Sequence, residues 1–261
     1  MMRSGSPAGA RPQLSLVVFF CACLTAAVLP PRRTHNIMLL PTGREVIERH
    51  VEAVGGQAAL MNVKSRYVWA RYEFPARRLR GTVELFTARP NRRVLKVEYP
   101  DMGTEITGFD GKVAWTSKPG EPVRLVEGAD LAQLRDESIF DFDLHPDSAF
   151  RSIETLDLVD FQGRRCYRVQ LLSVTGRQWW EYYDVATGLF AGNLFRRQTS
   201  RGAITVMTVV SDYRAFDGVR FPTKLSIRAA GTEEVVTVVR VRVNQVDSSV
   251  FNAPRQLRGP T

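Results

Sequence analysis

The densest group of side chains that could do chemistry is acidic. Asp136, Glu137, Asp141 and Asp143 lie close together in the chain, and carboxylates grouped in this way serve as an acid–base pair or as calcium ligands. The group lacks the spaced ligands and the glycine of a calcium-binding loop. We therefore interpret it as a solvated turn after a helix, and we expect no metal site.

The histidines and cysteines form no reactive group either. His35, His50 and His145 are too far apart for a ligand pattern such as His-Glu-x-x-His. Cys21 and Cys23 lie in an apolar N-terminal segment, so the rest of the chain contains Cys166 alone. A single thiol forms neither an intramolecular disulfide nor a metal site. Its strand-like surroundings predict a buried structural role.

The glycines belong to no nucleotide-binding or hydrolase motif. The sequence contains no Gly-x-Ser-x-Gly elbow, no Walker loop and no Gly-x-Gly-x-x-Gly. Gly55 and Gly56 follow a predicted helix and are typical of a helix C-cap. We therefore predict that the protein is not an enzyme, has no catalytic residues and needs no cofactor. Its function then depends on a surface or a cavity.

The chain is basic, with a formal net charge of +9, and its hydrophobic content of 44% is ordinary for a globular protein with a sizeable core. The arginines come as doublets at 77–78, 92–93, 164–165 and 196–197. A nucleic-acid partner would require them on one element with stacking aromatic residues, so we expect none. The doublets predict a solvated rim, whose charge favours contact with anionic lipid headgroups.

Residues 1–29 predict export. A polar start with two arginines precedes an apolar run from Leu14 to Leu29, which is shorter than the roughly 20 residues that span a bilayer comfortably. We expect a cleaved signal peptide first, an uncleaved membrane anchor second, because Arg32 and Arg33 follow the run, and a lipoprotein third. All three place the folded domain outside the cytoplasm, in the periplasm or cell envelope.

The remaining sequence predicts one domain. Thr42 is a suitable N-cap for a helix over 43–54, whose apolar residues form one stripe. A second helix, over 129–137, interrupts the strands that follow. The expected division is a linker over 30–42, a single domain over 43–254 and a tail over 255–261.

From Lys64 onward the hydrophobic period changes to two, which predicts β-strands. Turn signals such as Asp110-Gly111 and Asp217-Gly218 separate them, and such short connections favour antiparallel neighbours. We expect about eleven strands, at 65–74, 81–88, 92–99, 104–109, 112–117, 164–174, 177–184, 189–198, 203–214, 219–229 and 233–244.

Two of these strands are apolar on both faces. In the run 179–183 neighbouring aromatic rings must point to opposite faces of the sheet, and residues 203–210 are apolar throughout. Part of the sheet is therefore covered on both sides, or one side faces an apolar hollow. Periodicity alone favours these two alternatives equally.

The order of elements resembles the LolA/LolB-type lipoprotein-carrier superfamily, and more narrowly bacterial outer-membrane lipoprotein-sorting-like proteins. The resemblance covers roughly Gly43 to Pro254, and the motifs that carry it are VGGQAAL (54–60), GFDGKVAW (108–115), YDVATGL (183–189), SDYRAFDGVRFP (211–222) and SVFNAP (249–254). It implies an α+β, mainly antiparallel β fold. The expected architecture is an incompletely closed β-barrel, or half-barrel, wrapped over an N-terminal helix and a mid-chain helical segment, with an apolar cavity between them.

The resemblance implies a monomeric, periplasmic binding protein that carries or senses acyl chains of lipoproteins or lipids. The alternative is a protein-interaction or sensor module of the envelope without a bound lipid, which a filled core would favour. A one-residue change of register would turn each strand's apolar set to the other face. The residues expected to line the cavity are Trp69, Leu85, Leu95, Trp115, Tyr182, Val206 and Val238.

Overall fold

The computed structural model describes residues 39–199 and 202–257. The predicted signal peptide or anchor over 1–29 and most of the predicted linker lie outside the described residues, together with Cys21 and Cys23. Within the described ranges no helix is long and apolar enough to cross a membrane.

The N-terminal helix α1 (Gly43–Val54) confirms the predicted span and cap. Thr42 Oγ1 accepts a hydrogen bond from the Glu45 amide at 3.3 Å, and Glu45 Oε2 accepts one from the Thr42 amide at 2.6 Å. This reciprocal pair satisfies amides that have no partner within the helix. The apolar stripe that includes Val46 and Ile47 is buried. The helix ends at Val54; its C-cap is Gly55, whose φ of 138° only glycine adopts readily. The short helix α2 (Gln57–Asn62) follows.

The strands of the described chain form one antiparallel sheet of thirteen. Its order is β6-β5-β4-β3-β2-β1-β13-β12-β11-β10-β9-β8-β7, so two meanders meet where the first strand pairs with the last. The strands are β1 (Ser65–Phe74), β2 (Leu79–Ala88), β3 (Arg92–Tyr99), β4 (Gly103–Phe109), β5 (Ala114–Ser117), β6 (Arg124–Leu125), β7 (Phe150–Phe161), β8 (Arg164–Ser173), β9 (Gln178–Asp184), β10 (Phe190–Thr199), β11 (Gly202–Phe216), β12 (Val219–Ala229) and β13 (Thr232–Val243).

Two strands, β6 and β7, were not predicted from the sequence. The first has only two residues. The second has twelve residues, but its pairing with β8 shifts register between Phe150 and Ser152 and again between Thr155 and Asp157. Each shift inserts an extra residue and interrupts the alternation of apolar and polar positions. The period-two signal that revealed the other strands is therefore absent from this segment.

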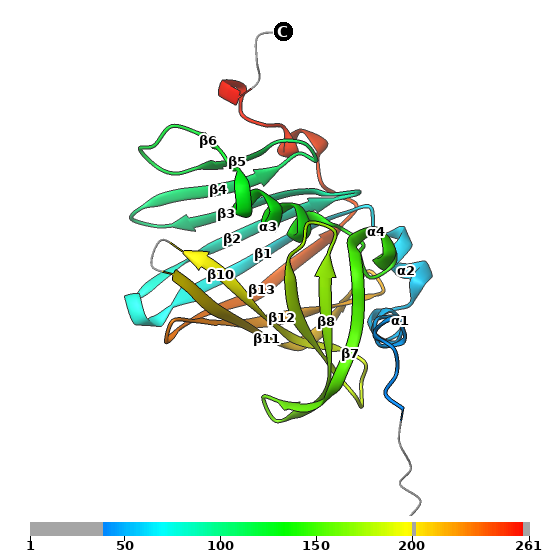
Figure 1. Ribbon diagram of the computed structural model, residues 1–261. Helices are drawn as coiled ribbons and strands as arrows, with labels where there is room; N and C mark the ends of the chain where they lie inside the picture. The colour runs from blue at the N-terminus through cyan, green and yellow to red at the C-terminus, as the bar shows by residue number, and fades with distance from the viewer. Residues whose placement is uncertain (1–38, 200–201, 258–261) are drawn as a thin grey trace, which may run out of the picture. The chain divides into compact units, whose positions relative to one another are not determined.

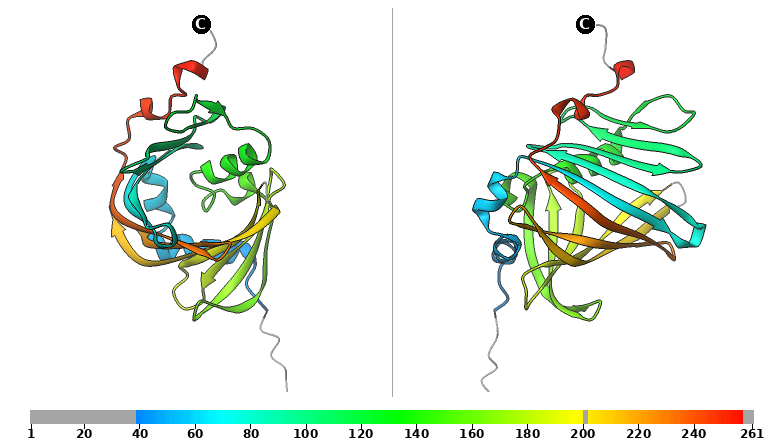
Figure 2. Two further views of the ribbon diagram at one scale, coloured as in Figure 1. Left: turned by 90° about the vertical axis from the view of Figure 1, so that its left-hand side faces the viewer. Right: turned by 180° about the vertical axis from the view of Figure 1, so that it is seen from behind.

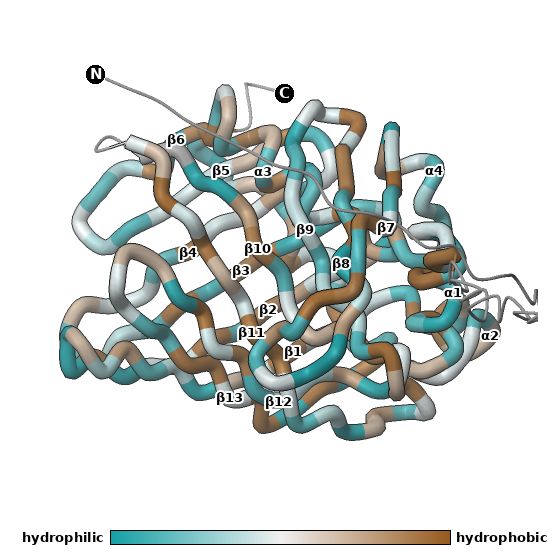
Figure 3. The backbone as a smooth tube through the Cα atoms, turned by 60° about the horizontal axis from the view of Figure 1, so that its bottom comes forward, coloured by the Kyte–Doolittle hydropathy of each residue, from teal (hydrophilic) through white to brown (hydrophobic). Residues whose placement is uncertain are grey.

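The sheet curls into an arc that is open between its two edge strands, β6 and β7 (Figures 1 and 2). Helix α3 (Gly128–Ser138) lies on the concave side, and α1 and α2 lie at one end of the barrel. The predicted half-barrel over an N-terminal helix and a mid-chain helix is confirmed. Figure 3 shows apolar and polar residues alternating along many of the strands, as a sheet with two different faces requires.

Helix α3 contacts strands from both halves of the sheet. On one side Leu134 packs on Phe109 of β4, and Glu137 pairs with Arg93 of β3 at 3.8 Å. On the other side Asp136 pairs at 3.1 Å with Arg177, which precedes β9. The face of the sheet that carries Arg93 and Phe109 is therefore the inner face. The short helix α4 (Pro146–Ala149) then leads the chain into β7.

The outer face of β2 to β5 is covered by the C-terminal segment, which includes the 3₁₀ helices η2 (Ser248–Phe251) and η3 (Arg255–Leu257). Trp115 and Phe251 are both almost fully buried there, and Leu257 packs against the same cluster. The Trp115 ring lies directly on Gly108, where an added Cβ would come within 2.2 Å of it. The strand needs glycine at this position because of that close approach.

Candidate ligand-binding cavity

The inner face carries apolar side chains that form rows across the strands. Each row joins residues that are direct partners in the ladder, so its members lie side by side. The first row is Leu95, Leu85, Val68 and Val241; the second is Val97, Val83, Ala70 and Val238; the third is Tyr72, Val236, Leu225 and Val210. These rows lie on the inner face because Leu95 and Val97 follow Arg93 at intervals of two residues.

Several members of these rows are only half-buried, among them Val68, Leu85 and Leu95. Val68 and Leu95 pack against the main apolar cluster, to which the buried Ala70 and Val83 belong. Tyr99 leans over Gly81 toward Tyr72, with ring centroids 5.8 Å apart. Side chains of a filled core would be fully buried. The inner face thus presents a continuous apolar surface that its own helices do not cover completely.

The inner side of the barrel contains two small cavities. Glu181 and Phe142 line both of them. The first, of about 180 Å³, lies between the end of α3 and strands β8 to β10. The second, of about 170 Å³, lies between α1 and strands β1, β9, β11 and β12. Each is much larger than the roughly 30 Å³ that one water occupies, so each can hold a small chemical group.

Glu181 is the buried carboxyl shared by these cavities. Its side chain accepts hydrogen bonds from Trp179 Nε1 at 3.0 Å and from the Tyr183 hydroxyl at 2.5 Å. Burial raises the pKa of Glu181 to about 7, although both hydrogen bonds favour the charged form. Burial also lowers the pKa of His50, whose Nδ1 lies 3.2 Å from the Phe190 amide. The same Nδ1 also lies 3.2 Å from the Gly188 carbonyl oxygen, a contact that favours the protonated ring.

Arg66 and Asp143 are two of the ionisable groups that line the second cavity. The phenyl rings of Phe140 and Phe221 flank the Arg66 guanidinium, with centroids 5.3 and 5.0 Å away. Arg66 Nε and Asp143 Oδ1 are both buried without a hydrogen-bond partner. Burial raises the pKa of Asp143 to about 7, and the charge of Arg66 opposes this change.

Other buried polar atoms without a partner gather on the same face. Thr87 Oγ1 and Asn193 Oδ1 are unsatisfied; Thr87 pairs with Arg66 in the ladder, and Asn193 lines the first cavity. Buried polar atoms normally have partners, and a cluster of exceptions in one place requires an explanation. Arg66, Asp143 and Asn193 line the two cavities, and Thr87 is the ladder partner of Arg66.

The acidic segment is not the solvated turn that we expected. The side chain of Asp136 is 3% exposed and binds Arg177, and that of Asp141 is 16% exposed and binds Arg89. Asp143 is half-buried, and its Oδ1 is enclosed. The prediction was wrong because the arginines that pair with these carboxylates, Arg89 after β2 and Arg177 before β9, are distant in sequence. No local pattern around the aspartates reveals those partners.

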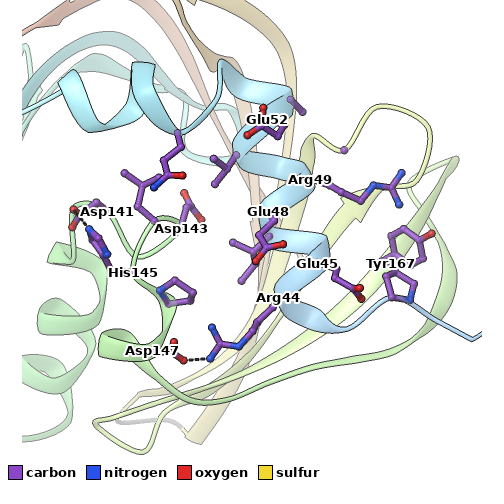
Figure 4. A pocket seen from close by; sticks show the side chains of 18 of the residues that line it. Arg44, Glu45, Glu48, Arg49, Glu52, Asp141, Asp143, His145, Asp147 and Tyr167 are labelled. Carbon is purple, nitrogen blue, oxygen red and sulfur yellow. Dashed lines mark ion pairs between the residues drawn. The ribbon is translucent and has the colours of Figure 1, made fainter.

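A broad groove on the outside of α1 has a different character (Figure 4). Charged residues of both signs line it, including the Arg44–Asp147 ion pair and His145, which lies 3.8 Å from Asp141. This mixture suits water and ions rather than an apolar ligand. Among the described residues no group of His, Cys, Asp and Glu could hold a metal ion.

The residues predicted to line a cavity are divided between the two faces. Leu85, Leu95, Val206 and Val238 lie on the inner face, and the first two are direct partners. Trp69, Trp115 and Tyr182 lie on the outer face. Trp69 pairs with Glu84, Trp115 packs under the C-terminal segment, and Tyr182 stacks on Phe161 with centroids 3.9 Å apart. The seven residues therefore do not surround one space.

The polar residues of the cavities, including His50, Arg66 and Glu181, were not predicted from the sequence. They lie in ordinary helix and strand patterns, and only the folded structure brings them together. The prediction for Cys166 is confirmed, since the thiol is free and buried, and burial raises its pKa to about 11.

The fold and these cavities define a half-barrel protein with an apolar inner face. The sequence matches no known family model and no curated protein. In structure it is similar to a DUF1329 family protein from Desulfovibrio piger (TM-score 0.56, 13% identity), covering 80% of this chain and 95% of the other. It is also similar to a LolA superfamily protein from Nitrosomonas europaea (TM-score 0.55, 12% identity), covering 82% and 99%.

A third similar structure is an outer membrane lipoprotein-sorting protein domain from Vibrio parahaemolyticus, with a TM-score of 0.54 and 11% identity. The match covers 80% of this chain and 96% of that domain. The chain therefore has the LolA-type fold that the sequence motifs predicted.

Proposed function

We propose that this protein is an exported cell-envelope protein that binds an acyl chain of a lipoprotein or lipid against the inner face of the half-barrel. The observation that carries the proposal is the first apolar row, in which Leu95, Leu85 and Val68 are in register and half-buried. A surface of this kind is unfavourable in water and becomes favourable when an apolar ligand covers it.

The energetics suit an acyl chain. Burying a methylene gains about 0.8 kcal/mol, so a fourteen-carbon chain gains roughly 10 kcal/mol before the losses of ordering the ligand. One protein chain supplies all three rows, so a monomer suffices. The predicted signal peptide and the lipoprotein-sorting domain with the same fold support an envelope location and a lipid ligand. The proposal assigns no catalytic step.

A matched pair of substitutions on β3 tests this proposal. Leu95→Arg places a charge in the first apolar row, and Glu98→Arg places the same charge on the outer face of the same strand. The measurement is the affinity of a fluorescent fatty acid, together with native mass spectrometry of lipid that co-purifies from a bacterial periplasm. Leu95→Arg should weaken binding by roughly tenfold or more, because the charge would be buried beside the ligand.

Glu98→Arg should bind as the wild-type protein does. Equal affinity in Leu95→Arg and wild type would show that the ligand does not occupy the inner face. A wild-type protein that takes up no lipid at all would favour the alternative function, a protein-interaction module of the envelope.

A further inference from the structure

We propose that the cavity beside Arg66 holds the carboxylate head of a long-chain fatty acid, whose chain lies on the apolar rows. This inference rests on the proposed function and names the ligand class of the same site. It follows from the position, burial and unsatisfied hydrogen bonding of one arginine.

Arg66 is an unusual residue for the inside of a barrel. A buried guanidinium is unfavourable unless acceptors surround it, and this one has a phenyl ring on each side and an Nε–H without a partner. The two rings restrict the guanidinium plane. Its unpaired Nε–H is a donor that a carboxylate oxygen can accept.

The cavity has room for such a head. Its volume of about 170 Å³ is several times that of a water molecule, but it is too small to hold a long acyl chain as well. The chain must therefore extend elsewhere. Val68, the first residue of the apolar rows on β1, follows Arg66 on the same face of the strand.

The length of the inner face is sufficient for the chain. From Arg66 to Phe74 the strand extends for about 26 Å at its usual rise per residue, and the same-face residues between them are Val68, Ala70 and Tyr72. A polar end followed by a long apolar path is the pattern of a single-chain amphiphile. One buried cation matches a head with a single negative charge.

The other charged groups around the cavity set its pH dependence. Burial lowers the pKa of His50 of α1, the Tyr213 hydroxyl of β11 donates to the Phe190 carbonyl at 2.8 Å, and Arg220 of β12 lies at the exposed rim. Asp141 is engaged by Arg89. The groups that change charge near neutrality are therefore Asp143 and Glu181.

When Asp143 and Glu181 are protonated, the charge of Arg66 is uncompensated and an anionic head is favoured. When they ionise, they neutralise Arg66 and repel the head. Binding of the fatty acid should therefore be tighter at pH 6 than at pH 8. An uncharged head of the same chain length should show no such change.

The test compares hexadecanoate with hexadecanol on the protein produced from its full sequence. The variants are Arg66→Met, which removes the charge at similar length, and Arg71→Met, an exposed arginine on the other face of the same strand. Wild type and Arg71→Met should prefer hexadecanoate. Arg66→Met should lose hexadecanoate affinity by roughly 10- to 100-fold, the value of a charge-assisted hydrogen bond, and bind hexadecanol unchanged.

Arg66→Met leaves Asp143 without the cation that favours its charged form, and removing one partner of a buried charge pair lowers stability. A thermal melt therefore checks that Arg66→Met is folded before the affinities are compared. Should Arg66→Met fail to fold, Arg66→Lys, which keeps the charge without the planar fork, should lose part of the preference for hexadecanoate. Asp143→Asn with Glu181→Gln should remove the difference between pH 6 and pH 8.

The outcomes separate this inference from the function on which it rests. Equal hexadecanoate affinity in Arg66→Met and wild type would overturn the inference, and so would equal wild-type affinity for the acid and the alcohol. If either result is obtained while the protein still binds hexadecanoate or hexadecanol, the proposed function remains supported. If neither ligand binds wild type, the proposed function fails as well. Acetate that competes as strongly as hexadecanoate would indicate a site for free carboxylates and overturn the assignment to an amphiphile.

Discussion

The stability of the protein without ligand should decrease as pH rises through the range in which Glu181 ionises. In the unfolded chain this carboxyl releases its proton near pH 4.5, whereas burial raises its pKa in the folded protein to about 7. Between these values the folded protein binds more protons than the unfolded chain. The free energy of unfolding must therefore fall as pH rises through this window, and remain level above it.

The size of the effect follows from the two pKa values. A difference between 4.5 and about 7 corresponds to about 3 kcal/mol of stability, present below pH 4.5 and lost above pH 7. Glu181→Gln removes this ionisation. The glutamine can still accept from Trp179 Nε1 and can donate to the Tyr183 hydroxyl, so its folded structure should be retained.

Urea unfolding at several pH values between 4.5 and 8, followed by tryptophan fluorescence, measures the difference. Glu181→Gln should match wild type at pH 4.5 and exceed its stability by about 3 kcal/mol at pH 8. Glu73→Gln, an exposed glutamate on the outer face of β1, is the matched control and should show a constant difference from wild type. If the free energies of unfolding of wild type and Glu181→Gln change equally with pH, the buried state of this carboxyl is refuted.

Two further substitutions test the fold around the site. Thr42→Ala removes the cap of α1 and should lower the free energy of unfolding by about 1 kcal/mol, as measured by urea unfolding; an unchanged midpoint would contradict the reciprocal bonds with Glu45. Trp115→Ala should lower it by roughly 3–5 kcal/mol and loosen the C-terminal segment over Phe251, as measured by proteolysis. It should leave fatty-acid binding intact, because Trp115 lies on the outer face; a loss of binding in a folded Trp115→Ala protein would contradict that placement.

The sequence by itself determined most of the local structure. Helix α1 has a capping box and one apolar stripe, and both are visible in consecutive residues, as are the glycine turns and alternating positions of most strands. These features depend on contacts within a few residues, so the pattern is enough to predict them. Strand β7 shows the limit, because its two register shifts interrupt the alternation on which the prediction relies.

The tertiary structure alone decided which face of each strand looks inward. Leu85 and Trp115 both lie in strands whose apolar and polar residues alternate. Leu85 is on the inner face, whereas Trp115 is under the C-terminal segment. Alternation divides residues into two sets without saying which set α3 will face. The buried charges depend in the same way on distant partners: Asp136 meets Arg177, and Arg66 lies between Phe140 and Phe221. Burial and charge pairing are properties of neighbours in space, and for these residues the neighbours come from other elements of the chain.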